Sequence, residues 1–203
     1  LLGYFAGRSL HELTERVASL CTPKLLLCGG IDPTAQAGLT ADMQHATRLG
    51  VQAYSIATAL TSQDAVSFTR LTEVPDDMLV ESVRALRRQS PPAIAKVGLL
   101  ASLRQLHLLV HEIRQLFPTC RIVWDPILRT SSGADLLPDA SREALLEAAQ
   151  SVDVLLPNSY ECSQLFGDVL PQDWAQRTST TVICKSAANS EESVTDRAYL
   201  SDG

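Results

Sequence analysis

The chain has 203 residues, of which 45% are hydrophobic and 20% charged, and its formal net charge is −6. This size and composition are typical of a single globular domain with a sizeable buried core. No run of Lys or Arg is longer than Arg87-Arg88, and together with the acidic balance this excludes the charge pattern of a nucleic-acid-binding protein. We also expect no membrane partner, because no apolar run reaches the roughly 18 residues of a spanning helix.

The cysteines indicate where the protein works. They are odd in number and show no Cys-x-x-Cys spacing. This usage favours a reducing compartment, and hence a cytoplasmic protein, over a disulfide framework or a structural metal site. The five are Cys21, Cys28, Cys120, Cys162 and Cys184.

The first predicted element is a helix over 9–20, where a capping box, Ser9-Leu10-His11-Glu12, precedes apolar residues at helical spacing. It belongs to an amino-terminal extension, residues 1–23, ahead of a domain over 24–203. Short apolar runs bounded by Gly, Pro, Asn or Asp predict buried strands at 24–28, 51–58, 93–100, 121–126, 152–157 and 180–185. Helical patterns lie between them at 38–49, 76–89, 102–117, 141–150 and 159–166, and Ser102 with Gln105 forms another capping box.

Strand and helix patterns thus alternate along the domain. Such alternation predicts a three-layer α/β/α sandwich with a mainly parallel central sheet. In this architecture ligands bind at the carboxyl ends of the strands, where the loops converge.

The turn after the first strand is rich in glycine and carries two carboxylates. Asp32 precedes Pro33, and we slightly favour a role as a turn residue over a role as a ligand. Asp42 lies inside the following helix, where a solvated surface carboxylate is the default. Gln63 ends an apolar stretch, so its amide is either a reader of a heterocycle edge or a polar loop residue.

Two later strand ends carry further polar residues. Asp125 closes a buried strand, a position suited to holding Mg²⁺ or water near a phosphate. Asn158 and Glu161 have the spacing of a helix N-cap and a capping box. That structural role is compatible with lining a ligand cleft, because the cap lies at a strand–helix junction.

Taken in order, these motifs resemble the hydroxymethylpyrimidine and phosphomethylpyrimidine kinases of thiamine biosynthesis, members of the ribokinase-like superfamily that also contains pyridoxal kinases. The resemblance covers residues 24–203. The residues that carry it are Gly30-Ile31-Asp32-Pro33, Ala37-Gly38-Leu39-Thr40-Ala41-Asp42, Gln63, Lys96-Val97-Gly98-Leu99-Leu100, Asp125-Pro126-Ile127-Leu128, Ser132-Gly133 and Pro157-Asn158-Ser159-Tyr160-Glu161.

The resemblance implies phosphotransfer, dependent on ATP and Mg²⁺, to hydroxymethylpyrimidine or its monophosphate. It places Asp42 and Gln63 on the pyrimidine as hydrogen-bonding residues. It also implies that Gly30, Leu99 and Ile127 line the pyrimidine pocket.

The same resemblance assigns the nucleotide side of the reaction. Asp125, Asn158 and Glu161 would organise Mg²⁺, water and the nucleotide phosphates, and Lys185 would neutralise the transferring phosphate. This assignment is physically reasonable, since phosphoryl transfer depends mainly on positioning and charge neutralisation. A homodimer is implied as well.

The chain departs from the family pattern at three places. Thr34-Ala35-Gln36 stands where the family has Ser-Gly-Gly, and Ser186-Ala187-Ala188 where it has Gly-Gly-His. The family's Gly-Thr-Gly-Cys or Gly-Thr-Gly-Asp anion-hole loop is absent, so the carboxyl-terminal part of the domain is expected to be missing, the catalytic residue stays unassigned, and the 203 residues alone are expected to show no turnover. A pyridoxal-type kinase and a non-catalytic pyrimidine-binding or regulatory module are the alternatives.

Overall fold

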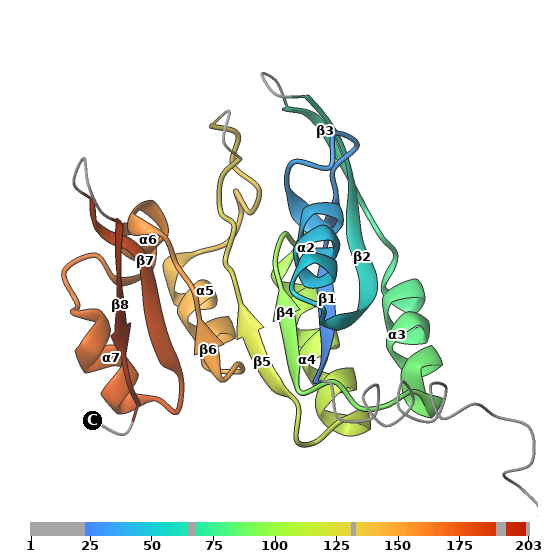
Figure 1. The fold of residues 1–203 in the computed structure, drawn as a ribbon. Helices are drawn as coiled ribbons and strands as arrows, with labels where there is room; N and C mark the ends of the chain where they lie inside the picture. The colour runs from blue at the N-terminus through green and yellow to red at the C-terminus, as the bar shows by residue number, and fades with distance from the viewer. Residues whose placement is uncertain (1–22, 65–67, 131–132, 190–193, 202–203) are drawn as a thin grey trace, which may run out of the picture.

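A computed structural model describes residues 23–64, 68–130, 133–189 and 194–201. The helix predicted at 9–20 lies outside these residues, as does nearly all of the amino-terminal extension. The rest of the predicted domain is an α/β fold around one sheet (Figure 1).

The sheet has eight strands in the order β3-β2-β1-β4-β5-β6-β7-β8. The six central strands are parallel, whereas β3 runs antiparallel to β2 and β8 antiparallel to β7. The predicted mainly parallel sheet is therefore confirmed. Its strands are β1 (Lys24–Ile31), β2 (Gln52–Gln63), β3 (Phe68–Glu73), β4 (Ile94–Val97), β5 (Arg121–Trp124), β6 (Val154–Leu155), β7 (Thr181–Asn189) and β8 (Val194–Tyr199).

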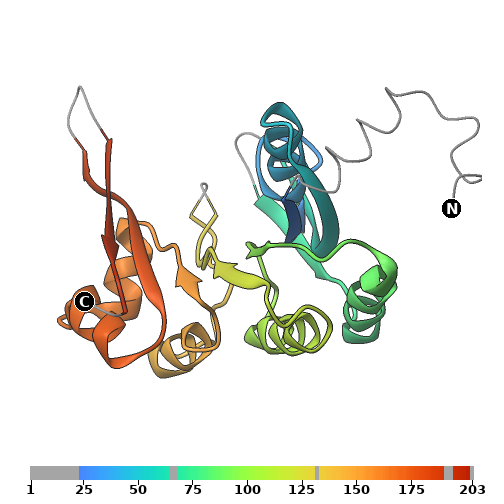
Figure 2. The same ribbon diagram turned by 60° about the horizontal axis from the view of Figure 1, so that its bottom comes forward.

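Helices lie on both faces of this sheet. Figure 2 shows α3, α4, α5 and α7 on one side and α2 on the other. In the part of the chain that the structure describes, no helix is long and apolar enough to cross a membrane. The helices are α2 (Gly38–Arg48), α3 (Asp76–Ala85), α4 (Leu103–Leu116), α5 (Arg142–Ala149), α6 (Ser159–Phe166) and α7 (Pro171–Arg177), with a 3₁₀ turn over Leu86–Arg88.

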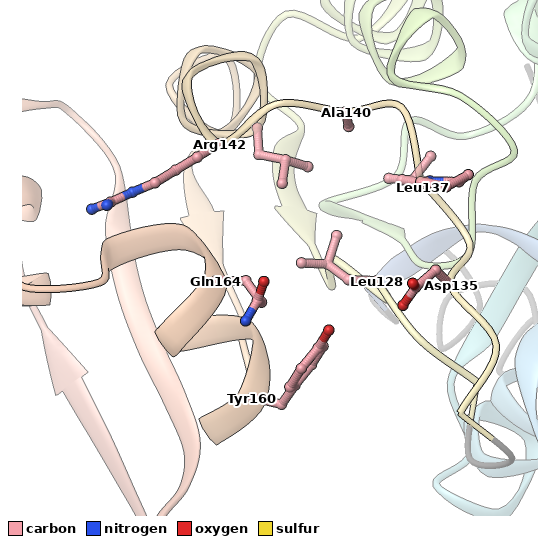
Figure 3. A pocket seen from close by; sticks show the side chains of 9 residues that line it. Leu128, Asp135, Leu137, Ala140, Arg142, Tyr160 and Gln164 are labelled. Atoms are coloured by element: carbon pink, nitrogen blue, oxygen red, sulfur yellow. The ribbon is translucent and has the colours of Figure 1, made fainter.

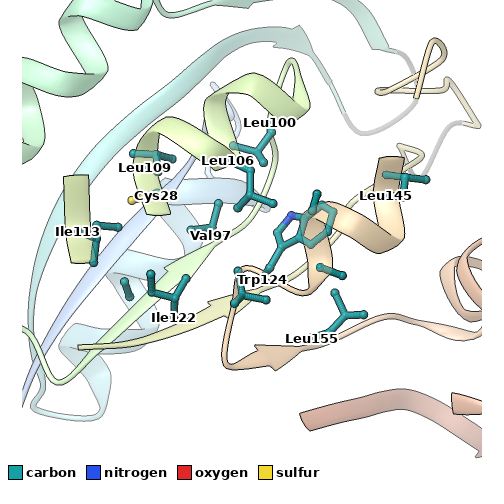
Figure 4. Packing of buried hydrophobic residues seen from close by; sticks show 14 of the residues in the cluster. Cys28, Val97, Leu100, Leu106, Leu109, Ile113, Ile122, Trp124, Leu145 and Leu155 are labelled. Atoms are coloured by element: carbon teal, nitrogen blue, oxygen red, sulfur yellow. The ribbon is translucent and has the colours of Figure 1, made fainter. Parts of the chain in front are cut away.

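The main core lies between the sheet and the helices of the larger layer. Trp124 of β5 is packed among residues of the neighbouring elements, including Val97, Leu106 and Leu155 (Figure 4), and all four are fully buried. A smaller cluster beneath α2 includes Leu27. The central strands are thus covered by apolar contacts on both faces, as their continuous apolar sequences predict.

Several predicted boundaries were wrong. The apolar run 93–100 is a strand only over β4, because its last residues leave the sheet and enter a loop. Leu100 in that loop is only 1% exposed, so its apolar character reflects packing rather than strand structure. The run 152–157 likewise shrinks to the two residues of β6.

Three elements were missed: β3, β8 and α7. Both strands are edges of the sheet, and edge strands with one solvated side carry no continuous apolar run. The capping box predicted at the start of α4 was also wrong, although the helix begins there. The Ser102 hydroxyl bonds Glu73 instead, and the buried Gln105 amide donates to the backbone carbonyls of Thr58 and Val74.

The parallel strands all end at the upper edge of the sheet in Figure 1. The paired strands β2 and β3, the segment after β5, and the paired strands β7 and β8 rise above this edge. The loops that follow β1, β4, β5 and β6 leave the sheet along it. We call it the carboxyl edge.

Candidate active site

The turn after β1 is organised by one carboxylate. Asp32 accepts hydrogen bonds from the backbone N–H groups of Thr34 and Ala37, both at 2.9 Å, and from the Thr34 hydroxyl. The Gln63 side chain bonds it as well. Burial alone would raise the pKa of the Asp32 carboxyl, but these hydrogen bonds outweigh burial and hold the pKa below its ordinary value. Asp32 therefore acts as a turn residue, the role that the sequence favoured.

The same turn contains two residues with left-handed backbone. Gly38 has a φ of 62°, and a Cβ atom there would lie 2.4 Å from the Gly30 carbonyl oxygen. Only glycine fits such a position without displacing the backbone. Ala35 has a φ of 57° and is the one described non-glycine residue with positive φ. It stands where the family pattern has a glycine.

Gly30 and Leu99, both predicted to line one pocket, are neighbours. A Cβ atom on Gly30 would lie 3.0 Å from the Leu99 Cδ2 atom, so the glycine leaves room for this side chain. Ile127 is close by, with its Cδ1 atom 3.9 Å from the corresponding point on Gly98. The structure thus gathers small and apolar side chains from β1, from the loop after β4 and from the loop after β5.

Asp42 is held by a lysine. The Lys96 Nζ atom donates to both of its carboxylate oxygens, at 2.7 and 2.8 Å. Asp42 is therefore not the solvated surface carboxylate that was its default interpretation. Among the described residues it shares no hydrogen bond with Gln63, which bonds Asp32 instead.

Lys96 also links Asp42 to the next strand. Its Nζ atom lies 3.9 Å from the Asp125 Oδ2 atom, and the Lys185 Nζ atom lies 2.5 Å from Asp125 Oδ1. Carboxylates and ammonium groups therefore alternate across the carboxyl edge, from α2 through β4 and β5 to β7. We call Asp42, Lys96, Asp125 and Lys185 the charge row. The strand order brings them together, although the paired residues are 54 and 60 positions apart in sequence.

Asn158 and Glu161 meet at the start of α6. The Asn158 side chain accepts from the Glu161 backbone N–H at 2.9 Å, and the Glu161 carboxylate accepts from the Asn158 backbone N–H at 2.7 Å. The predicted capping box is confirmed. It fixes both side chains at the point where the chain leaves β6, beside the charge row.

Glu161 is almost completely buried, at 2% exposure. Burial raises the pKa of its carboxyl, although the hydrogen bond from Asn158 and the charge of Lys185 oppose the shift. The Asp125 carboxylate also favours the protonated form. Glu161 therefore lies within electrostatic reach of the ion pair between Asp125 and Lys185.

Lys96 is the residue of this site to which sequence reasoning gave no role. It was quoted only as part of a motif. The available signal was its place inside the apolar run Ile94-Ala95-Lys96-Val97, because a lysine in a buried strand needs a partner. The sequence does not say which partner, since Asp42 and Asp125 are both distant along the chain.

A separate pocket of about 180 Å³ lies beside the site, between the segment after β5, α5 and α6 (Figure 3). Its lining includes Leu128, Asp135 and Tyr160, and none of the residues predicted to bind substrate or nucleotide. Arg129 pairs with Asp135 and stacks over the Tyr160 ring, 4.4 Å from its centre. These contacts hold the segment after β5 against α6.

A mainly parallel α/β sheet with charged groups gathered at its carboxyl edge is the arrangement of many small-molecule-binding α/β proteins. Comparison with known proteins identifies the family. The phosphomethylpyrimidine kinase family profile matches residues 32–195. The chain belongs to this family.

Two curated relatives show the extent of the likeness. The chain is 31% identical over 163 residues to the thiamine biosynthesis multifunctional protein of Corynebacterium efficiens, covering 80% of this chain and 22% of that protein. It is 30% identical over 144 residues to the hydroxymethylpyrimidine/phosphomethylpyrimidine kinase of Aquifex aeolicus, covering 70% of this chain and 56% of the relative. The chain therefore spans about half the length of that relative.

Solved structures share the fold. The phosphomethylpyrimidine kinase of Clostridium difficile superposes with a TM-score of 0.72 at 20% identity, over 90% of this chain and 85% of that one. The pyridoxal kinase of Staphylococcus aureus, in complex with pyridoxal, also gives 0.72, at 21% identity over 90% and 70% of the two chains. The predicted ribokinase-like fold is thus confirmed.

Proposed function

We propose that the protein phosphorylates hydroxymethylpyrimidine, its monophosphate, or both, with ATP as the phosphate donor. Family membership and the names of the curated relatives support this proposal. The observation that carries it is the charge row, which runs without interruption from the predicted pyrimidine residue Asp42 to the predicted phosphate residue Lys185. The pyrimidine that accepts the phosphate and the ATP that donates it would meet along this row.

One half of the edge suits an aminopyrimidine. We call Gly30, Asp42, Gln63, Leu99 and Ile127 the pyrimidine half. Lys96 pairs with Asp42, whose carboxylate oxygens can accept hydrogen bonds from an amino group, while 28% of the Asp42 side chain stays exposed. The apolar side chains beside Gly30 offer a surface for the flat ring.

The other half suits phosphates. We call Asp125, Asn158, Glu161 and Lys185 the phosphate half. Lys185 supplies a positive charge that is 35% exposed and held in place by Asp125, so it would neutralise charge on the transferring group. Mg²⁺, when bound, would supply a further positive charge beside the phosphates.

The residues of the phosphate half fit Mg²⁺ if water and the nucleotide phosphates supply the remaining ligands. Within the described residues no three His, Cys, Asp or Glu side chains form a group that could hold an ion by themselves. Mg²⁺ in nucleotide enzymes is commonly held by one or two carboxylates, with water and substrate phosphates completing the shell. Asp125 and Glu161 are two such carboxylates, and we propose that they hold Mg²⁺ only together with the nucleotide.

The test is ADP release by the full-length gene product with three acceptors: hydroxymethylpyrimidine, its monophosphate and pyridoxal. We expect turnover with one or both pyrimidines that exceeds turnover with pyridoxal. Preference for pyridoxal would contradict the proposed substrate. Pyrimidine binding without ADP release would contradict the proposed reaction and favour a binding module.

The cysteines support a proposal about the compartment in which the protein works. The four described cysteines are free thiols, which supports a reducing, cytoplasmic compartment. ATP and small metabolites are supplied there. We propose a cytoplasmic enzyme that acts on a small molecule.

A further inference from the structure

Two cysteines lie in contact with each other, and each is next in sequence to a residue of the phosphate half. Cys162 is in the first turn of α6, directly after Glu161, and Cys184 is in β7, directly before Lys185. Their Sγ atoms are 2.9 Å apart, with the Cys162 thiol donating to Cys184. Figure 1 shows α6 beside β7, and the two elements contact each other. No role has been assigned to either thiol.

The other two described cysteines provide a contrast. Cys28 and Cys120 are each 1% exposed. Burial raises the pKa of the Cys28 thiol to about 12 and that of Cys120 to about 11. Such thiols are unreactive, because the thiolate is the nucleophile and burial in an apolar environment suppresses it.

The environment of the paired thiols is different. The hydrogen bond from Cys162 lowers the pKa of the Cys184 thiol despite burial, and the charge of Arg197 acts in the same direction. Cys162 is itself only partly buried. The same hydrogen bond and burial raise the pKa of the Cys162 thiol. Two sulfurs thus lie in contact, one of them partly exposed to solvent, and this is the placement that a reactive thiol and its resolving partner require.

We propose that Cys162 and Cys184 are an oxidation site, at which hydrogen peroxide converts the two thiols into an intramolecular disulfide. The Cys184 thiolate attacks one peroxide oxygen, the O–O bond breaks, and the released hydroxide takes up a proton to form water. Cys162 then attacks the resulting sulfenic sulfur, the S–S bond forms, and the S–O bond breaks with loss of a second water. The two sulfurs together lose two electrons, and the peroxide gains them.

The disulfide would join the residue after Glu161 to the residue before Lys185. Oxidation would therefore fasten the start of α6 to β7 at the centre of the phosphate half. The inference rests on the sulfur geometry and does not require kinase activity.

The test is peptide mapping of the full chain carrying Cys21→Ser, after exposure to hydrogen peroxide and alkylation under native conditions. We expect a cross-linked peptide pair containing Cys162 and Cys184 whose mass is about 2 Da below the sum of the reduced peptides. A thiol reductant should restore both free thiols. Cys28 and Cys120 should be alkylated only after unfolding.

Two further variants serve as controls. Cys28→Ser should leave the cross-link intact, and Cys162→Ser should abolish it, with circular dichroism confirming that each variant is folded. The proposal is overturned if the wild-type pair stays reduced under peroxide, if either sulfur is oxidised to sulfinic acid without a cross-link, or if the cross-link joins other cysteines or two chains.

Discussion

The two halves of the carboxyl edge are built by different means. The pyrimidine half is shaped by the backbone of one turn, in which Asp32 gathers N–H groups and Gly38 admits a contact that no other residue allows. The phosphate half is shaped by strand ends and a capping box, with little backbone strain, and its character comes from charge. Substitutions in this turn should therefore change stability, whereas substitutions in the phosphate half should change charge balance with a smaller effect on the fold.

The largest effect is expected in the turn. Gly38→Ala should lower the free energy of unfolding by about 3 kcal/mol, because it combines a left-handed residue with a Cβ atom 2.4 Å from the Gly30 oxygen. The matched control is Gly50→Ala, which also has positive φ but nothing within 4 Å, and should cost about 1 kcal/mol. Urea denaturation measures both. Equal losses of unfolding free energy in the two variants would show that the close contact at Gly38 contributes nothing to the difference in stability.

The next effect depends on pH. Asp32→Ala should cost about 2 kcal/mol near neutral pH, because a carboxylate that accepts several hydrogen bonds is lost. Since the pKa of Asp32 is lowered in the folded state, the contribution is present above the ordinary pKa and disappears as the pH falls through the folded value.

The wild-type advantage over Asp32→Ala should therefore shrink in acid below about pH 4. Free energies of unfolding measured from neutral pH into acid give this curve. Asp168→Ala, at an exposed carboxylate, is the control and should show little difference at any pH. An advantage of Asp32 that grows in acid would contradict the sign of the shift.

Lys96 contacts Asp42 of the pyrimidine half and Asp125 of the phosphate half, so its removal tests whether the two halves act separately. Lys96→Met should weaken pyrimidine binding by about tenfold, because Asp42 loses the cation that orients it. Lys96→Arg should restore part of the affinity. The control is Arg84→Met, which removes a cation paired with Glu112 between α3 and α4. Pyrimidine affinity that is unchanged in Lys96→Met would separate this lysine from the substrate site.

The smallest effect concerns the residue that departs from the family turn. Ala35→Gly should raise the free energy of unfolding by up to about 1 kcal/mol, because glycine relieves the left-handed backbone at this position. Ala41→Gly is the comparison, because Ala41 lies inside α2 and glycine in the interior of a helix brings only added flexibility, a loss of about 1 kcal/mol. Thermal denaturation of the two variants should shift in opposite directions.

Local patterns were the most predictable part of this molecule. The Asn158 capping box spans four residues, and it was found from the sequence because spacing alone determines it. Central strands were found from their apolar runs, although their ends were not. The edge strands β3 and β8 were missed because most of their described side chains are exposed, so their sequences carry no such run.

Long-range contacts could not be predicted in the same way. The pairing of Asp42 with Lys96 depends on β4 lying beside β1, and nothing local in either segment specifies that neighbour. The family resemblance identified Asp42 and Lys185 as site residues but not the lysine between them. The left-handed Ala35 was likewise visible only as a missing glycine.

The division of the edge into two halves is tested most directly by calorimetric titration of two variants of the full-length protein. Asp42→Ala should weaken binding of hydroxymethylpyrimidine by at least about tenfold and leave the affinity for Mg²⁺-ATP within about twofold of wild type. Asp125→Ala should weaken binding of Mg²⁺-ATP by at least about tenfold and leave the affinity for hydroxymethylpyrimidine within about twofold of wild type. Equal losses for both ligands in both variants, or no loss in either, would contradict the account.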